Sequence, residues 1–156
     1  MNRLVCRMER PFRVSLIGDD AAPQRWAVFC AVAKAAGRSL FYKERVDFLL
    51  GGDAAFIRVA AAAVRCANEA RPSTTARLLL FLPAKVEPDD DCPFDGIERI
   101  PPAPGGARPE HLREAVDRAD ACLFCVAAQA GDAHAALCYA AAAQKPCRNL
   151  ADDFLP

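Results

Sequence analysis

The chain has 156 residues, 53% of them hydrophobic and 26% charged, and its 20 basic residues balance its 20 acidic ones. This composition is typical of a globular domain with a buried core and excludes an intrinsically disordered chain. A chain without net charge lacks the positive field with which proteins bind nucleic acid or an anionic membrane surface.

No apolar stretch approaches the roughly 20 residues that a membrane-spanning helix needs. The first eleven residues carry several charged side chains and do not resemble a signal peptide. We therefore expect one cytoplasmic domain over residues 1–156, with a core at about 13–150 and with neither nucleic acid nor a membrane as partner.

Four short apolar runs, each close to a turn-forming stretch, are the main signal of the fold. A continuous apolar run is typical of a parallel strand that helices cover on both faces. Alternation of such runs with alanine-rich, helix-like segments predicts a three-layer, Rossmann-like α/β domain with a mostly parallel sheet. The runs are Arg13–Gly18, Val46–Gly52, Arg77–Pro83 and Ala121–Val126, with Ile17, Leu49, Leu80 and Phe124 expected in central strands.

The first predicted helix spans residues 24–36 and ends at Gly37, a natural helix stop. Residues 39–42 would then be extended or belong to the following loop. The apolar residues of this helix that fall at helical spacing, and that we expect to form its apolar face, are Trp26, Phe29, Cys30 and Ala33.

Three further helices are predicted at 54–70, at 110–119 and at 133–144. Residues 83–109 hold seven of the twelve prolines and read as a long irregular connection, with 97–100 as a short pairing segment. A last strand is expected at 146–150, and the tail from 152 to 156 should be loose. The apolar faces comprise Phe56, Val59, Ala60, Ala63 and Val64 in one helix, and Leu112, Ala115, Val116 and Ala119 in the next.

Eight cysteines raise the question of a metal site or disulfides. The only pair at ligand spacing is Cys122 and Cys125, and both lie in a predicted strand. Residues three apart in a strand point to opposite faces, whereas redox pairs and zinc sites need both sulfur atoms on one side. We therefore expect no bound metal and no disulfide, and we expect Cys122 and Cys125 to act as small buried hydrophobic residues.

Ligands of open α/β sheets bind beyond the carboxyl ends of the strands, so the candidate site lies there. Glycines at these ends allow sharp turns and close approach of a ligand to the backbone. Aspartates at the same ends could face a ligand or could cap the following helices, and the sequence leaves both alternatives open. The glycines are Gly18, Gly51, Gly52 and Gly131, and the aspartates are Asp19, Asp20, Asp53 and Asp132.

No catalytic residue is predicted from these motifs. His111 and His134 have no partner at metal-ligand spacing and are expected at solvated surface positions. The chain has no GxSxG nucleophile turn, no GxGxxG fingerprint and no P-loop.

The order of motifs between residues 13 and 150 resembles the SLOG superfamily of Rossmann-like domains, and within it the bacterial YpsA-like branch (DUF1273). The resemblance rests on a Gly turn after the first strand, a Gly-Gly-x-x-x-Phe stretch, a Leu-Pro strand end, a helix ending in Ser-Asp, and a closing Asn-Leu strand. The corresponding residues here are Gly18-Asp19-Asp20, Gly51-Gly52 with Phe56, Leu82-Pro83, His111–Asp120 and Asn149-Leu150. The polar signature differs, because the family's His-Arg is Asp19-Asp20 here and its Arg-Asn is His111-Leu112.

The resemblance implies a domain that binds a nucleotide-related small ligand, with Phe56 and Arg113 beside the glycines at the site. Our leading interpretation is binding without catalysis and without a cofactor. One alternative is an N-glycosidase-like hydrolase of nucleosides or nucleotides, with Asp53 or Asp19 as the catalytic carboxylate. Another is an interaction domain with a vestigial pocket, and the sequence also leaves a homo-oligomer open. If the aspartates face the pocket, a bare phosphate should bind poorly and a nucleoside, a cationic group or a Mg²⁺-bridged phosphate is favoured.

Overall fold

The computed structural model describes residues 10–20, 24–88, 94–106 and 108–154. The strands described form one sheet in the order β4-β3-β2-β1-β5-β6, and every neighbouring pair is parallel. This confirms the predicted α/β class and the parallel sheet. The elements are β1 (Phe12–Gly18), α2 (Arg25–Tyr42), β2 (Arg45–Gly52), α3 (Ala54–Glu69), β3 (Thr75–Pro83), β4 (Gly96–Ile100), α4 (Glu110–Arg118), β5 (Ala121–Cys125), α5 (Asp132–Ala142), β6 (Cys147–Asn149) and the 3-10 helix η2 (Leu150–Asp153).

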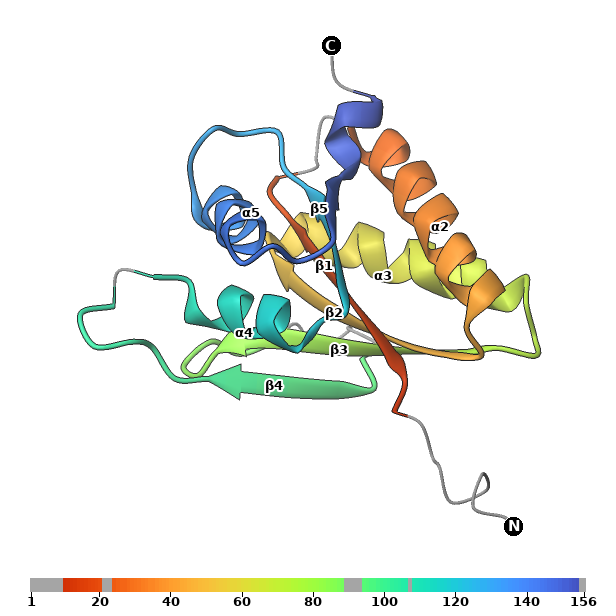
Figure 1. Cartoon of the computed structure of the whole chain (residues 1–156), viewed down its shortest axis with the longest axis horizontal. Helices are drawn as coiled ribbons and strands as arrows, with labels where there is room; N and C mark the ends of the chain where they lie inside the picture. Colours follow the sequence, from red (N-terminus) through yellow and green to blue (C-terminus); the bar gives the residue numbers. More distant parts are fainter. Residues whose placement is uncertain (1–9, 21–23, 89–93, 107, 155–156) are drawn as a thin grey trace.

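The sheet is the middle of three layers, with α2 and α3 on one face and α4 and α5 on the other (Figure 1). Consecutive residues of β2 divide between the two cores: Phe48 and Leu50 pack on the α2–α3 side, and Leu49 on the α4–α5 side. A strand buried on both faces needs apolar residues at every position, which explains the continuous apolar runs. Ile17, Leu49, Leu80 and Phe124 all lie in inner strands, as predicted.

Helix α2 is longer than the sequence indicated. It continues through Gly37 to Tyr42, so the predicted stop at Gly37 and the extended or loop segment 39–42 were wrong. A glycine inside a helix costs about 1 kcal/mol. Burial of Leu40 in the core, one turn beyond Gly37, outweighs that cost.

The predicted apolar face of α2 was right only in part, since Phe29 and Ala33 are half-buried and pack against the core. The helix packs on the core through Val28, Val32, Ala35, Ala36 and Leu40. Trp26 is 74% exposed, and Cys30 is exposed as well. Apolar residues form two stripes at helical spacing on this helix, and periodicity alone cannot tell which of them meets the sheet.

Gly37→Ala should stabilise the protein. A Cβ at this position meets no atom within 4 Å, and the backbone is helical. Alanine reduces the conformational freedom of the unfolded chain and favours the helix, so the free energy of unfolding should rise by about 0.5–1 kcal/mol. Urea denaturation followed by circular dichroism measures the change, and a lower midpoint would contradict the description of α2.

The other elements agree with the sequence, apart from the tail. The predicted face of α4 is buried, and 97–100 pairs with β3 as the edge strand β4. Residues 150–153 form η2, and Phe154 packs against the α2–α3 core, so the expectation of a loose tail was wrong up to residue 154. Residues 155 and 156 lie outside the described ranges.

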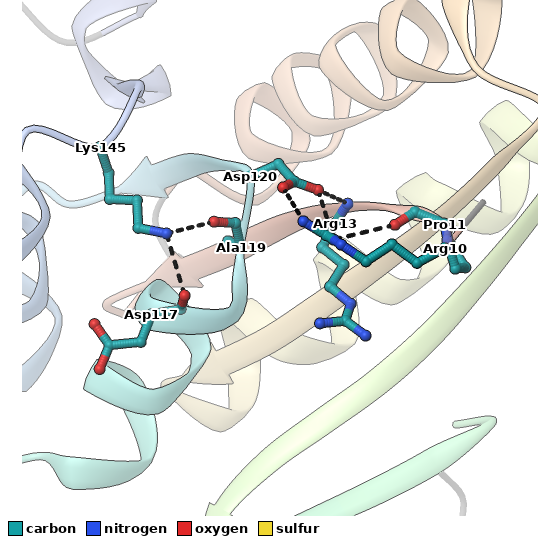
Figure 2. A network of polar contacts seen from close by, with 7 residues as sticks. All are labelled: Arg10, Pro11, Arg13, Asp117, Ala119, Asp120 and Lys145. Atoms are coloured by element: carbon teal, nitrogen blue, oxygen red, sulfur yellow. Dashed lines mark hydrogen bonds and ion pairs between the residues drawn. The ribbon is translucent and has the colours of Figure 1, made fainter.

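Asp120, just before β5, is hydrogen-bonded to residues at the start of β1 (Figure 2). Its carboxylate accepts two hydrogen bonds from the Arg10 guanidinium, at 3.1 and 2.6 Å, and one from the backbone N–H of Arg13 at 2.9 Å. Burial alone would raise the pKa of Asp120, but the hydrogen bonds from Arg10 and Arg13 outweigh it and hold the pKa below its usual value. The contact therefore contributes stability above the ordinary aspartate pKa that is lost as the pH falls through the lowered one.

Lys145 caps the C-terminal end of α4 (Figure 2). Its ammonium group donates to the carbonyl oxygen of Asp117 at 3.1 Å and to that of Ala119 at 2.7 Å. The last carbonyls of a helix have no partner within the helix, and a cation also suits the negative end of its dipole. These contacts hold the end of the sheet opposite the candidate site.

The cysteine pair behaves as the strand predicts. Cys122 packs in the α4–α5 core and Cys125 in the α2–α3 core, so the two sulfur atoms face opposite sides of β5. Burial, together with the nearby Asp19, raises the pKa of Cys125 to about 12. Cys6 and Cys92 lie outside the described residues. In the described part of the chain, no helix has the length and apolar character to cross a membrane.

Candidate functional site

A pocket of about 260 Å³ opens at the carboxyl ends of β1 and β2. From β1 the chain builds β2, β3 and β4 on one side and then crosses to β5 and β6 on the other. The point where the strand order reverses, between β1 and β5, is where open α/β sheets bind their ligands. The pocket lining comprises Gly18, Asp19, Asp20, Gly52, Asp53, His111, Leu112, Asp132 and Ala133.

Two glycines bring the tips of β1 and β2 into contact. Gly52 has φ +111°, and a Cβ there would collide with the carbonyl oxygen of Gly18. That oxygen accepts a hydrogen bond from the backbone N–H of Asp53 at 3.0 Å. A Cβ on Gly18 would lie 2.5 Å from the ring of Phe56. The floor of the pocket is therefore backbone, which only glycine allows at these positions.

Asp19 bridges the reversal point. One of its carboxylate oxygens accepts hydrogen bonds from the consecutive N–H groups of Ala127 at 2.9 Å and Ala128 at 2.8 Å, just after β5. Its own N–H donates to the carbonyl oxygen of Cys125 at 3.1 Å. Successive N–H groups of this kind form an anion-binding nest. Here the protein's own carboxylate fills the nest.

Asp53 caps helix α3. Its carboxylate accepts the N–H of Ala55 at 2.9 Å, as an N-cap residue does. Of the two roles that the sequence left open, Asp53 caps the following helix, whereas Asp19 binds the backbone after β5 and not the helix that follows it. Both residues also line the pocket.

The remaining charged groups make the pocket acidic. Asp20 and Asp132 are exposed at its rim, and Asp132 lies in the first turn of α5. Among the described lining residues there are four aspartates and no lysine or arginine. Burial lowers the pKa of His111, and the charge of Asp132 opposes this only in part, so the imidazole is neutral at pH 7.

The titration of His111 should report on Asp132. We expect a pKa below 6.5 for the His111 imidazole, and a further decrease in Asp132→Asn because the carboxylate that raises it is gone. Because the folded pKa is lowered, stability should fall as the pH drops through the window below about 6.5. Proton NMR of the two histidines, assigned with His134→Gln, measures this. A His111 pKa unchanged by Asp132→Asn would contradict the geometry.

Four of the predicted site residues do not line the pocket. Gly51 is buried against Leu112, and Phe56 lies beneath Gly18 in the core. Gly131, with φ +100°, precedes the first turn of α5. Arg113 stacks over the ring of Tyr139, with its guanidinium carbon 4.1 Å from the ring centroid.

Sequence reasoning missed three lining residues. His111 and Leu112 come from the first turn of α4, and Ala133 from the first turn of α5. His111 is half-buried, so the expectation of a solvated position was wrong, and His134 is half-buried too. The signal was available for His111, because it falls where the family pattern places a polar pair.

Within the described ranges, no group of three or more histidine, cysteine or acidic side chains is arranged to hold a metal ion. A scan against protein-family models and a search of curated proteins found no match to this chain. The resemblance to the SLOG superfamily therefore stays a prediction, and the site must be interpreted from its own chemistry.

Proposed function

We propose that the domain binds a small, nucleoside-like ligand that carries no phosphate, in the pocket at the tips of β1 and β2, and does no chemistry on it. The observation that supports this most is that four aspartates line the pocket and that nearby backbone N–H groups are already hydrogen-bonded to two of them. Two of these carboxylates, Asp19 and Asp53, line the pocket and already bind the backbone N–H groups of Ala127, Ala128 and Ala55 behind it.

The chemistry of the pocket suits hydroxyl and amino groups. Carboxylates accept hydrogen bonds from ribose hydroxyls or a base amine. Helix α5 has no side-chain cap hydrogen bond at its start, so its first N–H groups can supply donors, while Asp132 in that turn offsets the positive dipole end. A volume of about 260 Å³ is just below the roughly 300–1,000 Å³ that is usual for ligand pockets, which favours a ligand no larger than a nucleoside.

A hydrolase function has less support. The two carboxylates that it would use, Asp19 and Asp53, are both engaged with backbone N–H groups. A general base must be free to reach the attacking water, and these backbone contacts hold both carboxylates in other positions. Incubation with adenosine and inosine should release no free base on chromatography, and turnover would revive the hydrolase alternative.

Calorimetry with adenosine and AMP, without Mg²⁺, tests the proposal. Two unit charges 4 Å apart interact by roughly 4 kcal/mol at an effective dielectric of 20. We therefore expect AMP to bind at least about tenfold more weakly than adenosine, equivalent to 1.4 kcal/mol. Asp132→Asn should reduce this difference in affinity. It should strengthen the binding of AMP, which carries a negative charge, and should change the Kd of adenosine, which carries none, by less than about threefold.

Asp152→Asn serves as the matched control, because Asp152 is exposed in η2 and does not line the pocket. It should change neither affinity. Tight AMP binding that Asp132→Asn does not alter would refute the acidic-pocket argument. Failure of both ligands to bind would favour the vestigial-pocket alternative.

A further inference from the structure

The exposed face of α2 carries an unusual set of aromatic residues. Trp26, Phe41 and Tyr42 are 74%, 60% and 78% exposed, and Phe29 stacks on Trp26 with ring centroids 5.4 Å apart. The aromatic residues form two groups, Trp26 with Phe29 and Phe41 with Tyr42, and Trp26 and Phe41 are about 22 Å apart along the helix at 1.5 Å per residue. Large exposed apolar patches on soluble domains mark interaction sites.

One hollow lies beside each of these two groups. The first, of about 480 Å³, lies between α2 and α3, where Trp26 and Phe29 face Val59 and Ala62. The second, of about 380 Å³, lies beside Gly37 and Phe41 near the end of α2. Both are roomier than the pocket at the strand tips. Together we call them the α2–α3 groove.

The charged residues that line the groove are all basic. They are Arg25 and Arg58 in the first hollow and Lys34, Arg38 and Arg71 in the second. The chain as a whole is neutral, so this clustering is local. Aromatic and arginine side chains are also the types that contribute most to binding at protein interfaces.

We propose that the α2–α3 groove binds an acidic amphipathic helix of a partner protein. Apolar side chains of the partner would enter the two hollows, and its acidic residues would meet the basic rim, a helix-in-groove mode of recognition. This goes beyond ligand binding at the strand tips, which uses a different surface.

The charge of the groove decides between occupants. In a two-fold dimer through this face the same patch lies on both subunits, so neither subunit would bring acidic residues to the basic residues of the groove. A flat membrane surface would contact the exposed Trp26 and Tyr42 but would not fill the hollow that Val59 and Ala62 line. Base stacking needs open aromatic faces, and one face of Trp26 is covered by Phe29.

Trp26 is the only tryptophan of the chain, and its fluorescence reports on the groove directly. The probes are acetylated 18-residue peptides free of tryptophan and tyrosine, with leucines at three helical registers and glutamate elsewhere. We expect at least one to shift the Trp26 emission to shorter wavelength with a micromolar Kd. Versions with lysine in place of glutamate should bind at least tenfold more weakly.

Two pairs of variants make the test specific. Arg25→Glu combined with Lys34→Glu should weaken binding at least tenfold, whereas Lys85→Glu, an exposed charge reversal after β3, should not. Phe41→Ala should weaken peptide binding at least fivefold. Ile97→Ala, which truncates an exposed side chain on β4, should leave the affinity for the peptide unchanged. The variants concern surface residues, and circular dichroism verifies that each one folds.

Several outcomes would overturn the proposal. One is a Trp26 emission that no acidic peptide changes at concentrations up to 1 mM, a Kd of about 1 mM being the weakest specific contact worth considering. Another is equal affinity for the acidic and the basic peptides. A third is tighter binding of single-stranded DNA or of anionic phospholipid vesicles than of the acidic peptides. A dimer in sedimentation velocity that Phe41→Ala dissociates would also overturn it, in favour of a second copy of the chain.

Discussion

Gly52→Ala is expected to destabilise the domain more than any other single change considered. Gly52 has φ +111°, which side-chain-bearing residues rarely adopt, at a strain of roughly 1–3 kcal/mol. Its new Cβ would also collide with the backbone oxygen of Gly18, which cannot move without opening the tips of β1 and β2. Overpacking adds roughly 1–3 kcal/mol, for a total of about 4 kcal/mol.

Gly131→Ala is the matched control. Gly131 also has a positive φ, of +100°, but a Cβ there meets no atom within 4 Å. The stability lost in Gly131→Ala should therefore reflect backbone strain alone. Urea denaturation of both variants isolates the close approach of β1 and β2 as the difference. Equal losses would contradict the contact between the two strand tips.

Asn149→Ala should have the second largest effect. The Asn149 side chain makes three hydrogen bonds: it accepts from the N–H of Val126 at 3.0 Å, accepts from the N–H of Ala151 at 3.2 Å, and donates to the carbonyl oxygen of Val126 at 2.9 Å. Val126 is buried, so alanine leaves its N–H and carbonyl without these partners. A loss of about 2–3 kcal/mol is expected.

Asn149→Asp offers a sharper test with a defined pH dependence. The ionised carboxylate keeps the acceptor but sets a charge against the carbonyl oxygen of Val126. Protonation restores a donor, so the folded pKa should be raised and stability relative to wild type should recover as the pH falls. Arg148→Ala, an exposed neighbour in a surface ion pair with Asp153, should cost less than about 1 kcal/mol. A difference in stability between Asn149→Asp and wild type that grows as the pH falls would contradict the geometry.

The parallel sheet was predictable because its strands are buried on both faces. Residues such as Phe48, Leu49 and Leu50 had to be apolar in succession, and that pattern is visible without a structure. Helix α2 was not predictable in the same way. It carries one apolar stripe toward the core and another toward solvent, and only contacts with the sheet distinguish Val28 and Val32 from Trp26.

The position of the site followed from topology, whereas its polarity depended on contacts. Parallel strands bring their carboxyl ends together, so Gly18 and Gly52 could be placed at one edge from the sequence. That Asp19 would turn to the N–H groups of Ala127 and Ala128 required the three-dimensional path of the loop after β5. The role of Asn149 was hidden for the same reason, since two of its hydrogen bonds are to the backbone of Val126, just after β5.

The most direct test of the account is a titration of ¹⁵N-labelled protein with adenosine, followed by two-dimensional NMR. If the pocket at the strand tips binds a nucleoside, the largest shifts should occur at the amides of Asp19, Gly52 and Ala133. The indole N–H of Trp26 should not move, because it lies in the α2–α3 groove. No shift at millimolar adenosine, or shifts confined to residues around Trp26, would contradict the proposed site.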